Sequence, residues 1–305
     1  MIRFAALVLI VALAPVVVHY PELETQILTF GLLAISFSLL LGEMGFLSFG
    51  QATFNGVGAY AAARLLIDAH AALPLALLVA LAAGALAAAA VGALAITGRG
   101  VYGVMLTFAF NEMAYYVAFQ WRGVTGGDNG LRGIPRPDVF GISLDDPTRY
   151  YAFVAVVVLL AFAAVLRLNA SPFGAVLRAI RENEDRARSI GFRTKRFKVG
   201  AFAISGALAG LAGGLYAELY RFVPLQAIDL DTSTNVVIAA LLGGAGSPFG
   251  ALLGAAIFTV LSDSLSHVWS HWPLIFGVVF CAVVLFFRGG LWSLVDRRSG
   301  RAAHA

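Results

Sequence analysis

Few side chains in this sequence could do chemistry, and they form no catalytic group. The five histidines, at positions 19, 70, 267, 271 and 304, lie in loops, at the ends of apolar segments or in the C-terminal tail. The sequence has no His-Glu-x-x-His pair, no Walker-type phosphate loop and no Gly-x-Ser-x-Gly turn. Its single cysteine, Cys281, lies in an apolar segment and is expected to be a small buried side chain. We therefore expect neither an enzyme nor a metal or cofactor site in this chain.

The polar residues inside apolar segments are the remaining candidates for function. Glu112 follows Asn111 within the apolar segment 101–121, and an unpaired acid is costly inside a membrane. A pathway role and a structural hydrogen bond to a neighbouring helix explain it equally well. Gln51 and Asn55 lie in SFGQATFNGVGAYAAARLL, where polar groups need partners or water. We take these four residues as candidates for a solute pathway.

A glycine-rich break interrupts the apolar segment 235–262. The break carries Gly243, Gly244, Gly246 and Ser247, followed by Pro248. Interrupted helices can present free backbone N–H groups to a carboxylate in a cavity, so the break is a further pathway candidate. A tight turn between two short spans is the simpler alternative.

The elements that must position these residues are membrane helices. Of the 305 residues, 60% are hydrophobic and 12% are charged, which is about half the charged share of soluble domains. Apolar segments long enough to cross a bilayer recur along the chain. The candidate full spans are 4–20, 26–42, 46–66, 73–97, 101–121, 150–168, 199–217 and 268–287.

Basic residues set the expected orientation. The stretch 171–198 holds 11 of the 38 charged residues, eight of them basic, and this places the loop 169–198 in the cytoplasm. The tail with Arg288, Arg297, Arg298 and Arg301 is also expected inside, and the turn-rich loop 122–149 outside. We expect one all-α membrane domain over residues 1–305. It has about eight full spans plus a broken or re-entrant pair (8–10 spans), and both termini are cytoplasmic.

The charged stretch itself reads as an amphipathic helix. Ser171-Pro172 is a helix start, and Gly191 is a C-terminal stop. Val176, Ile180, Ala187 and Ile190 fall on one face at helical spacing, with charged residues on the rest. Such a helix is either a plain topology loop or a docking surface for a soluble partner. The candidate docking residues are Val176, Ile180, Arg181, Glu182, Asp185, Ala187 and Gly191.

Small residues recur every four positions in two spans. One ridge is Ala76, Ala80, Gly84, Ala88 and Gly92, and the other is Gly206, Gly210 and Gly214. Such ridges let helix backbones approach closely in lipid, so we expect them to pack within the bundle.

From Gly42 to Gly290 the motifs resemble the LivM-like permeases of branched-chain amino acid ABC importers. The resemblance rests on GEMGFLSFGQATFNGVGAYAAARL, RGVYGVMLTFAFNEM, TGGDNGL, the stretch from SPFGAVLRAIRENEDRARSIGF to GGLYA, and LLGGAGSPFGALLGA. It implies that Asp185, Ala187 and Gly191 match the loop by which importer permeases couple to their ATPases, whereas Arg186 departs from that pattern. The family often has His where this chain has Gln51.

The resemblance implies a subunit of a bacterial inner-membrane importer that forms half of the pathway for branched-chain or hydrophobic amino acids. The expected partners are a second homologous permease, two cytoplasmic ATPases that bind ATP and Mg²⁺, and a periplasmic binding protein, besides membrane lipid and no nucleic acid. Urea and short amides are the alternative substrates. An ion-coupled secondary transporter is the alternative class, although it would need several buried acids.

Overall fold

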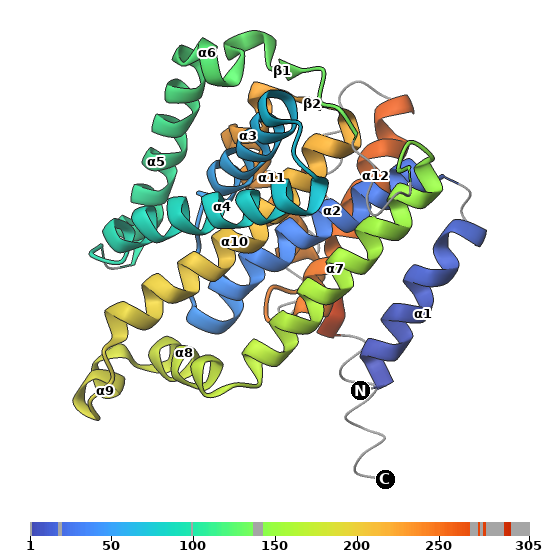
Figure 1. Ribbon diagram of the computed structural model, residues 1–305. Coiled ribbons are helices and arrows are strands. Elements are labelled where there is room, and N and C mark those ends of the chain that lie inside the picture. Colours follow the sequence, from blue (N-terminus) through green and yellow to red (C-terminus); the bar gives the residue numbers. More distant parts are fainter. Residues whose placement is uncertain are drawn as a thin grey trace.

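The computed structural model describes residues 2–17, 20–98, 100–136, 143–268, 274, 277–278 and 290–293. These residues form a helical bundle with one short two-stranded sheet (Figure 1). The elements are α1 (Ile2–Val17), α2 (Pro21–Ser38), the π-helix η1 (Leu39–Met44), α3 (Gln51–Ala69), α4 (Leu73–Ala95), α5 (Val101–Gln120), α6 (Arg122–Thr125), the 3₁₀ turn η2 (Gly127–Asn129), β1 (Leu131–Arg132), α7 (Pro147–Asn169), α8 (Pro172–Glu182), α9 (Glu184–Ser189), α10 (Thr194–Tyr220), β2 (Phe222–Val223), the 3₁₀ turn η3 (Leu225–Ile228), α11 (Leu230–Gly243) and α12 (Pro248–Val268).

Five described helices are long and apolar enough to cross a membrane. They are Pro21–Met44, Leu73–Ala95, Pro147–Asn169, Thr194–Tyr220 and Pro248–Ser266. Helices α1 and α11 are shorter, and polar residues such as Asn55 and Glu112 lower the hydropathy of α3 and α5. The all-helical, multi-span architecture is thus confirmed, while the count of about eight full spans stays a prediction. Most of the expected last span 268–287, and the basic tail from Arg288, lie outside the described residues.

The helix ends gather at two opposite polar ends of the bundle. One common groove is lined by residues 44–47, the α4–α5 turn, α8, α9 and the start of α10, and we call this the α8–α9 end. At the other end β1 pairs with β2 in antiparallel register, with Leu131 opposite Val223, and we call it the β1–β2 end. Figure 1 places the start of α1 toward the α8–α9 end. Which of these ends faces the cytoplasm stays a prediction.

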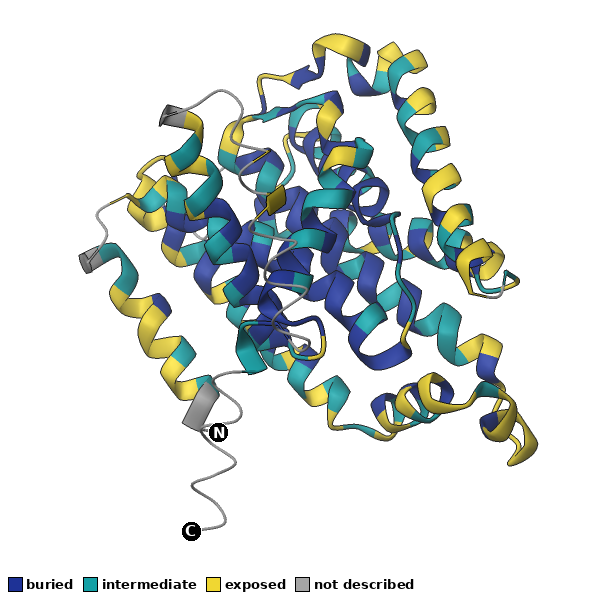
Figure 2. Cartoon of the chain, turned by 180° about the vertical axis from the view of Figure 1, so that it is seen from behind, coloured by how far each residue is buried: buried dark blue, intermediate teal, exposed yellow. Residues whose placement is uncertain are grey.

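Helices α3, α4 and α10 pack against one another, and α2 with η1 is the most deeply buried of the candidate spans. Figure 2 shows the buried residues gathered in the middle of the bundle. The expected small-residue ridge of α4 is its buried face, and it packs on the glycines of α10. A Cβ at Gly84 or Gly210 would overlap the backbone of the facing helix. Both ridges therefore pack within the bundle, as expected, and leave the backbones in direct contact.

The β1–β2 end is fixed by a buried arginine. Arg136 donates to Glu218 Oε1 at 3.3 Å, to the Glu218 carbonyl at 2.9 Å and to the Leu144 carbonyl at 3.0 Å. Its guanidinium also lies 4.4 Å from the ring centroid of Tyr150. These bonds hold the segment after β1 against the end of α10, so the described part of the loop before residue 137 is structured, as its turn residues predict.

Candidate functional site

The start of α3 lies buried at the centre of the bundle. A helix start leaves its first backbone N–H groups without helical partners, and here the residue before it, Gly50, has no side chain to cap them. Other helices supply the acceptors: Ala52 N–H donates to Ser233 Oγ at 2.9 Å, and Thr53 N–H donates to Asn111 Oδ1 at 3.2 Å. The first turn of α3 is therefore capped by side chains of α11 and α5.

Asn111 is the hub of this buried polar cluster. Its side chain is fully buried, and its Oδ1 also accepts from Thr53 Oγ1 at 2.9 Å. Its Nδ2 donates to the Ile228 carbonyl at 3.0 Å. One amide thus joins α5, α3 and η3, and every polar atom of the Asn111 side chain has a protein partner.

Gln51, the first residue of α3, makes a second buried polar cluster. Its Oε1 lies 3.0 Å from Ser36 Oγ, and its Nε2 donates to Ser205 Oγ at 3.1 Å. Ser205 in turn donates to the Ser36 carbonyl at 2.7 Å. The fully buried Gln51 side chain therefore ties α2, α3 and α10 together, and it lines none of the cavities described below.

Asn55 differs, because it lines a cavity of about 180 Å³ between α2, α3, α10, η3, α11 and α12. Its Nδ2 has only one long contact, 3.5 Å to the Ala227 carbonyl. The other described lining residues are Gln26, Thr29, Phe30, Leu33, Tyr216, Leu219, Gln226, Ala227, Thr232, Phe258, Thr259 and Ser262. None of these side chains is charged.

The hydroxyl and amide groups of this cavity differ in the hydrogen bonds that they can offer a solute. Thr29, Thr232 and Ser262 already donate to backbone carbonyls at 2.8–3.0 Å, so each can offer a solute only its lone pairs. The amides of Asn55, Gln26 and Gln226 supply donors. Phe30 and Phe258, with ring centroids 5.3 Å apart, provide an apolar wall. The cavity therefore suits a small solute without net charge that has both polar and apolar parts.

A wider opening of about 650 Å³ lies beside this cavity toward the β1–β2 end. Gln26 and Leu219 line both spaces, so the two adjoin. Tyr216 lines the inner cavity and Tyr220 the outer opening, with ring centroids 4.8 Å apart. The described residues thus outline a route from the β1–β2 end to Asn55.

Glu112 does not belong to the hydrogen-bonded cluster of its neighbour Asn111. It is half-buried and makes no hydrogen bond or ion pair within the described part of the chain. The buried face of α5 consists of Gly103, Thr107, Asn111 and Ala118, and Glu112 lies beside that face. Asn111 thus has a structural role, whereas the structural hydrogen bond that was the alternative for Glu112 is not found among the described residues, and a pathway role for Glu112 stays a prediction.

The glycine break forms a tight turn at the α8–α9 end. Helix α11 ends at Gly243, Gly244 has φ +111°, and Ser247 N–H donates to the Gly244 carbonyl at 3.2 Å. Gly243 packs on the backbone of α12, and Gly246 is exposed with open space around its Cα. Helix α11, at about 1.5 Å per residue, separates this turn from the Asn55 cavity by about 20 Å. The break and Asn55 therefore do not share one site.

The charged stretch forms two helices, not the single helix expected from 171 to 191. Asn183, with φ −160°, interrupts it, and Asn183 Oδ1 accepts from Arg186 N–H at 2.9 Å to cap α9. The pattern Asn-Glu-Asp is a helix-start signal, because acids in the first turn favour the helix dipole, and it is the signal that sequence reasoning missed. Both expected ends are confirmed: Ser171 caps α8, and Gly191, with φ +99°, ends α9.

The expected apolar stripe is also corrected. Ile180 and Ala187 are buried against the protein together with Leu177, Val176 is half-buried, and Ile190 is 69% exposed. The stripe therefore fixes α8 and α9 to the bundle and does not form an outward face. The exposed side is a tip, which we define as Glu182, Asp185, Ile190, Gly191 and Phe192.

Two arginines attach α8 to the end of α2. Arg178 Nη1 lies 2.7 Å from Glu43 Oε2, and Arg181 donates to the Gly42 carbonyl. Gly42 also packs against Ala245 in the glycine break. The tip is thus connected to the π-helical end of α2, whose other half lines the Asn55 cavity.

Helix α9 is attached to α10 through Glu184. Its carboxylate lies 2.5 Å from Lys198 Nζ and 3.1 Å from Thr194 Oγ1. Partial burial opposes ionisation, but Lys198, with Thr194 and Arg188, outweighs it and lowers the pKa of Glu184. The tip is therefore held by an ionised Glu184 at neutral pH.

Residues 22–288 match the family model described as "Branched-chain amino acid transport system / permease component". The chain belongs to this permease family. It is 31% identical over 281 residues to the high-affinity branched-chain amino acid transport system permease protein LivM of Escherichia coli strain K12, and 29% identical to LivM of Salmonella typhimurium. Each alignment covers 83% of this chain and 65% of the relative.

This chain is also similar to permeases of another import system. The autoinducer 2 import system permease protein LsrC of Escherichia coli O9:H4 is 29% identical over 252 residues, which cover 79% of this chain and 71% of LsrC. No solved structure matches the chain. The family and its apolar helices make this a multi-pass membrane protein, and its relatives are transport subunits for different solutes.

Proposed function

We propose that this chain is the permease subunit of a bacterial inner-membrane ABC importer. Together with a second homologous permease it forms the pathway, two cytoplasmic ATPases bind ATP and Mg²⁺, and a periplasmic protein delivers the solute. The observation that carries the proposal is the tip: it projects from the α8–α9 end, yet α8 is fastened to α2, which lines the Asn55 cavity. A topology loop would need the basic residues but not this attachment.

Motion of the tip reaches the cavity through α2. When the ATPases close, they press on the tip, and Arg178 and Arg181 pass the displacement to η1. A π-helix interrupts regular α-helical bonding and is often found at functional sites, so η1 is a natural place for α2 to take up this displacement. Movement of α2 then changes the wall formed by Gln26, Thr29 and Leu33.

The proposed solute is a branched-chain or other hydrophobic amino acid. The charges of its ammonium and carboxylate groups sum to zero, so the amino acid fits a cavity whose described lining is uncharged. Phe30 and Phe258 suit its aliphatic side chain. Urea and short amides fit the same amide donors without using the apolar wall, which favours the amino acid.

An ion-coupled transporter fits the described residues less well. Of the three buried acids that the structure describes, Glu24, Glu43 and Glu218, the last two are each paired with an arginine, Arg178 and Arg136 respectively. A carboxylate that is bound in this way is not free to carry a coupling ion through the membrane. The pairing therefore supports ATP-driven transport.

Co-expression with candidate importer ATPases and a candidate binding protein from the same genome tests the proposal. In proteoliposomes, ATP-dependent leucine uptake and co-purification of the ATPases are both expected. Ile190→Asp in the tip should abolish both, because it places a charge in the apolar contact. Trp121→Asp is the matched control, since Trp121 is an exposed apolar residue at the β1–β2 end. Uptake driven by an ion gradient without ATPases would contradict the proposal.

A further inference from the structure

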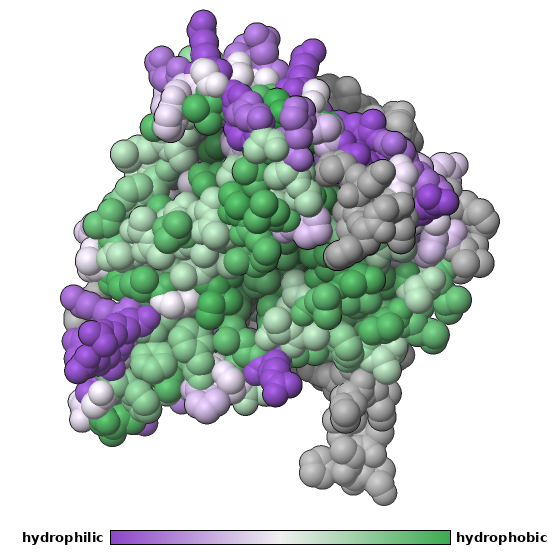
Figure 3. Space-filling view, viewed as in Figure 1, coloured by the Kyte–Doolittle hydropathy of each residue, from purple (hydrophilic) through white to green (hydrophobic). Residues whose placement is uncertain are grey.

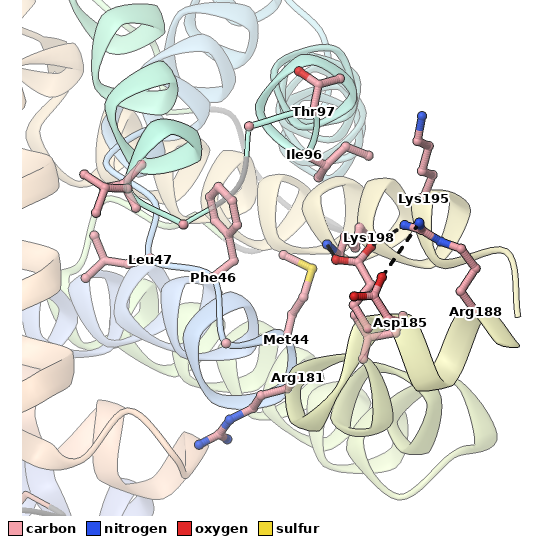
Figure 4. Close-up of a pocket in the computed structure, with 17 residues that line it drawn as sticks. Met44, Phe46, Leu47, Ile96, Thr97, Arg181, Asp185, Arg188, Lys195 and Lys198 are labelled. Carbon is pink, nitrogen blue, oxygen red and sulfur yellow. Dashed lines mark hydrogen bonds and ion pairs between the residues drawn. The ribbon is translucent and has the colours of Figure 1, made fainter.

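A groove of about 830 Å³ lies at the α8–α9 end and shares Arg181 and Asp185 with the proposed coupling contacts, while its other lining residues are not used by the transport argument. It runs between residues 44–47, the turn from α4 to α5, and the charged faces of α8, α9 and α10. Figure 4 shows Phe46, Leu47 and Ile96 on one side of it and Arg188 and Lys195 on the other. The groove therefore has one apolar wall and one ionic wall.

The ionic wall carries unneutralised positive charge. Its described side chains are four cations and two acids, Arg181, Arg188, Lys195, Lys198, Glu184 and Asp185, so their net charge is +2. Lys198 and Arg188 share Glu184, at 2.5 and 3.4 Å. Lys195 is exposed and makes no ion pair or hydrogen bond within the part of the chain that the structure describes. Arg188 also lies 3.9 Å from Asp185, but its side chain is half-exposed. Lys195 is therefore the cation available to an anion, with Arg188 beside it.

The apolar wall continues into the apolar surface of the bundle. Val101 and Val104, which line the groove, begin α5, and Val101 is 68% exposed. The neighbouring residues Tyr102 and Met105 of α5 are also exposed. In Figure 3 a hydrophilic patch at the left, where Figure 1 places α9 and the start of α10, borders hydrophobic surface. A ligand in this groove would thus contact cations and the lipid-facing surface together.

We propose that this groove binds an anionic phospholipid of the inner leaflet, which goes beyond the proposed transport function. The headgroup phosphate pairs with Lys195 and Arg188, and an acyl chain lies along Ile96, Val101 and Val104. Basic pockets beside membrane helices on the cytoplasmic side recognise anionic headgroups by this combination of contacts. An acidic soluble partner would satisfy the cations but would leave the apolar wall without a counterpart.

The test measures lipid binding to the purified full-length chain in neutral detergent. Phosphatidylglycerol, phosphatidylcholine and inorganic phosphate are titrated separately, and bound lipid is counted by native mass spectrometry. Phosphatidylglycerol should bind at least tenfold more tightly than phosphatidylcholine. Lys195→Gln should weaken it about fivefold, the factor for one basic residue at an anionic membrane surface. The double variant with Arg188→Gln should weaken it roughly 25-fold if both cations act independently.

Two further variants separate the sources of binding. Arg149→Gln removes an exposed cation at the other end of the bundle and should change nothing. Val104→Asn should weaken phosphatidylglycerol binding with Lys195 intact, because it interrupts the apolar wall. Lys195 has no described partner, so Lys195→Gln should leave the fold intact. This single variant therefore tests the proposal even if the double variant unfolds. Equal binding of phosphatidylcholine, or full competition by millimolar phosphate, overturns the proposal. So does protection of Lys195 from acylation by the ATPases but not by phosphatidylglycerol.

Discussion

Replacing Asn111 by leucine tests whether Asn111 has a structural role that its neighbour Glu112 lacks. Leucine has a similar size, so the cavity that it leaves is small. The change orphans two buried backbone groups, Thr53 N–H and the Ile228 carbonyl, which Asn111 now binds at 3.2 and 3.0 Å. Each unsatisfied buried group costs about 1–3 kcal/mol. Hydrogen bonds between membrane helices average about 0.6 kcal/mol, because the unfolded chain also finds partners. We expect a net loss of about 2–4 kcal/mol.

Thermal unfolding of the detergent-solubilised chain measures this loss. At about 2 °C per kcal/mol for a chain of this size, Asn111→Leu should lower Tm by about 4–8 °C. Glu112→Gln is the matched control, since Glu112 has no described hydrogen bond that the change would break, and its Tm should shift by less than about 1 °C. Thr53→Val should fall between them, because it removes only the hydroxyl that lies 2.9 Å from Asn111 Oδ1. An Asn111→Leu variant as stable as Glu112→Gln would refute the role of Asn111 as the cap of α3.

Three further predictions concern packing, pH and the tip. Gly206→Leu should prevent tight packing of α10 on α4 and lower Tm by more than 5 °C, because a Cβ at Gly206 already overlaps the facing backbone. The pKa of Glu184 is lowered in the folded chain, so its stabilising effect is complete above its ordinary value of 4.5 and is lost as the pH falls through the folded pKa; hydrogen exchange of α9 should rise below about pH 4.5, and Glu184→Gln should remove that rise. Gly191→Ala should cost about 1–2 kcal/mol of local stability, since Gly191 has φ +99° and open space around it, and should reduce ATP-coupled transport. Gly246→Ala is its control, because Gly246 has open space without a positive φ; equal transport by both variants would show that the end of α9 plays no part in coupling.

Local features of the fold could be predicted from the sequence, because their causes lie within a few residues. Ser171 and Gly191 mark helix ends by their own chemistry, and the ridge through Gly84 follows from helical periodicity. The break after Gly243 was predictable for the same reason. Asn183 shows the limit: its helix-start pattern lies inside a stretch that is also consistent with one helix. Only the packing of Ile180 and Ala187 on the bundle decides between the two.

The candidate site could be predicted only in part, because its partners are distant in the sequence. Thr53 and Asn111 are 58 residues apart, and Gln51 and Ser205 are 154 apart. A sequence shows that Gln51 needs a hydrogen-bond partner, but the rotation of three helices decides whether that partner is a serine or a solute. Asn55 alone among the four polar candidates lines a described cavity. Asn55 and Gln51 both carry amide side chains in the same apolar segment, so nothing in the local sequence distinguishes the two.

The arrangement of α2 explains how one helix can join specificity to coupling. At the α8–α9 end, Glu43 and Gly42 bind Arg178 and Arg181, so α8 and η1 move together. Toward the β1–β2 end, Gln26, Thr29 and Leu33 of the same helix line the neutral cavity. Between them, Ser36 binds Gln51 and Ser205, which fixes the middle of α2 to α3 and α10. A helix that is held at its middle and displaced at one end must tilt or bend about that point, and η1 lies on the displaced side. If Ser36 is the pivot, removing the Gln51–Ser36 bond should loosen coupling more than solute binding, whereas changing Asn55 should do the reverse.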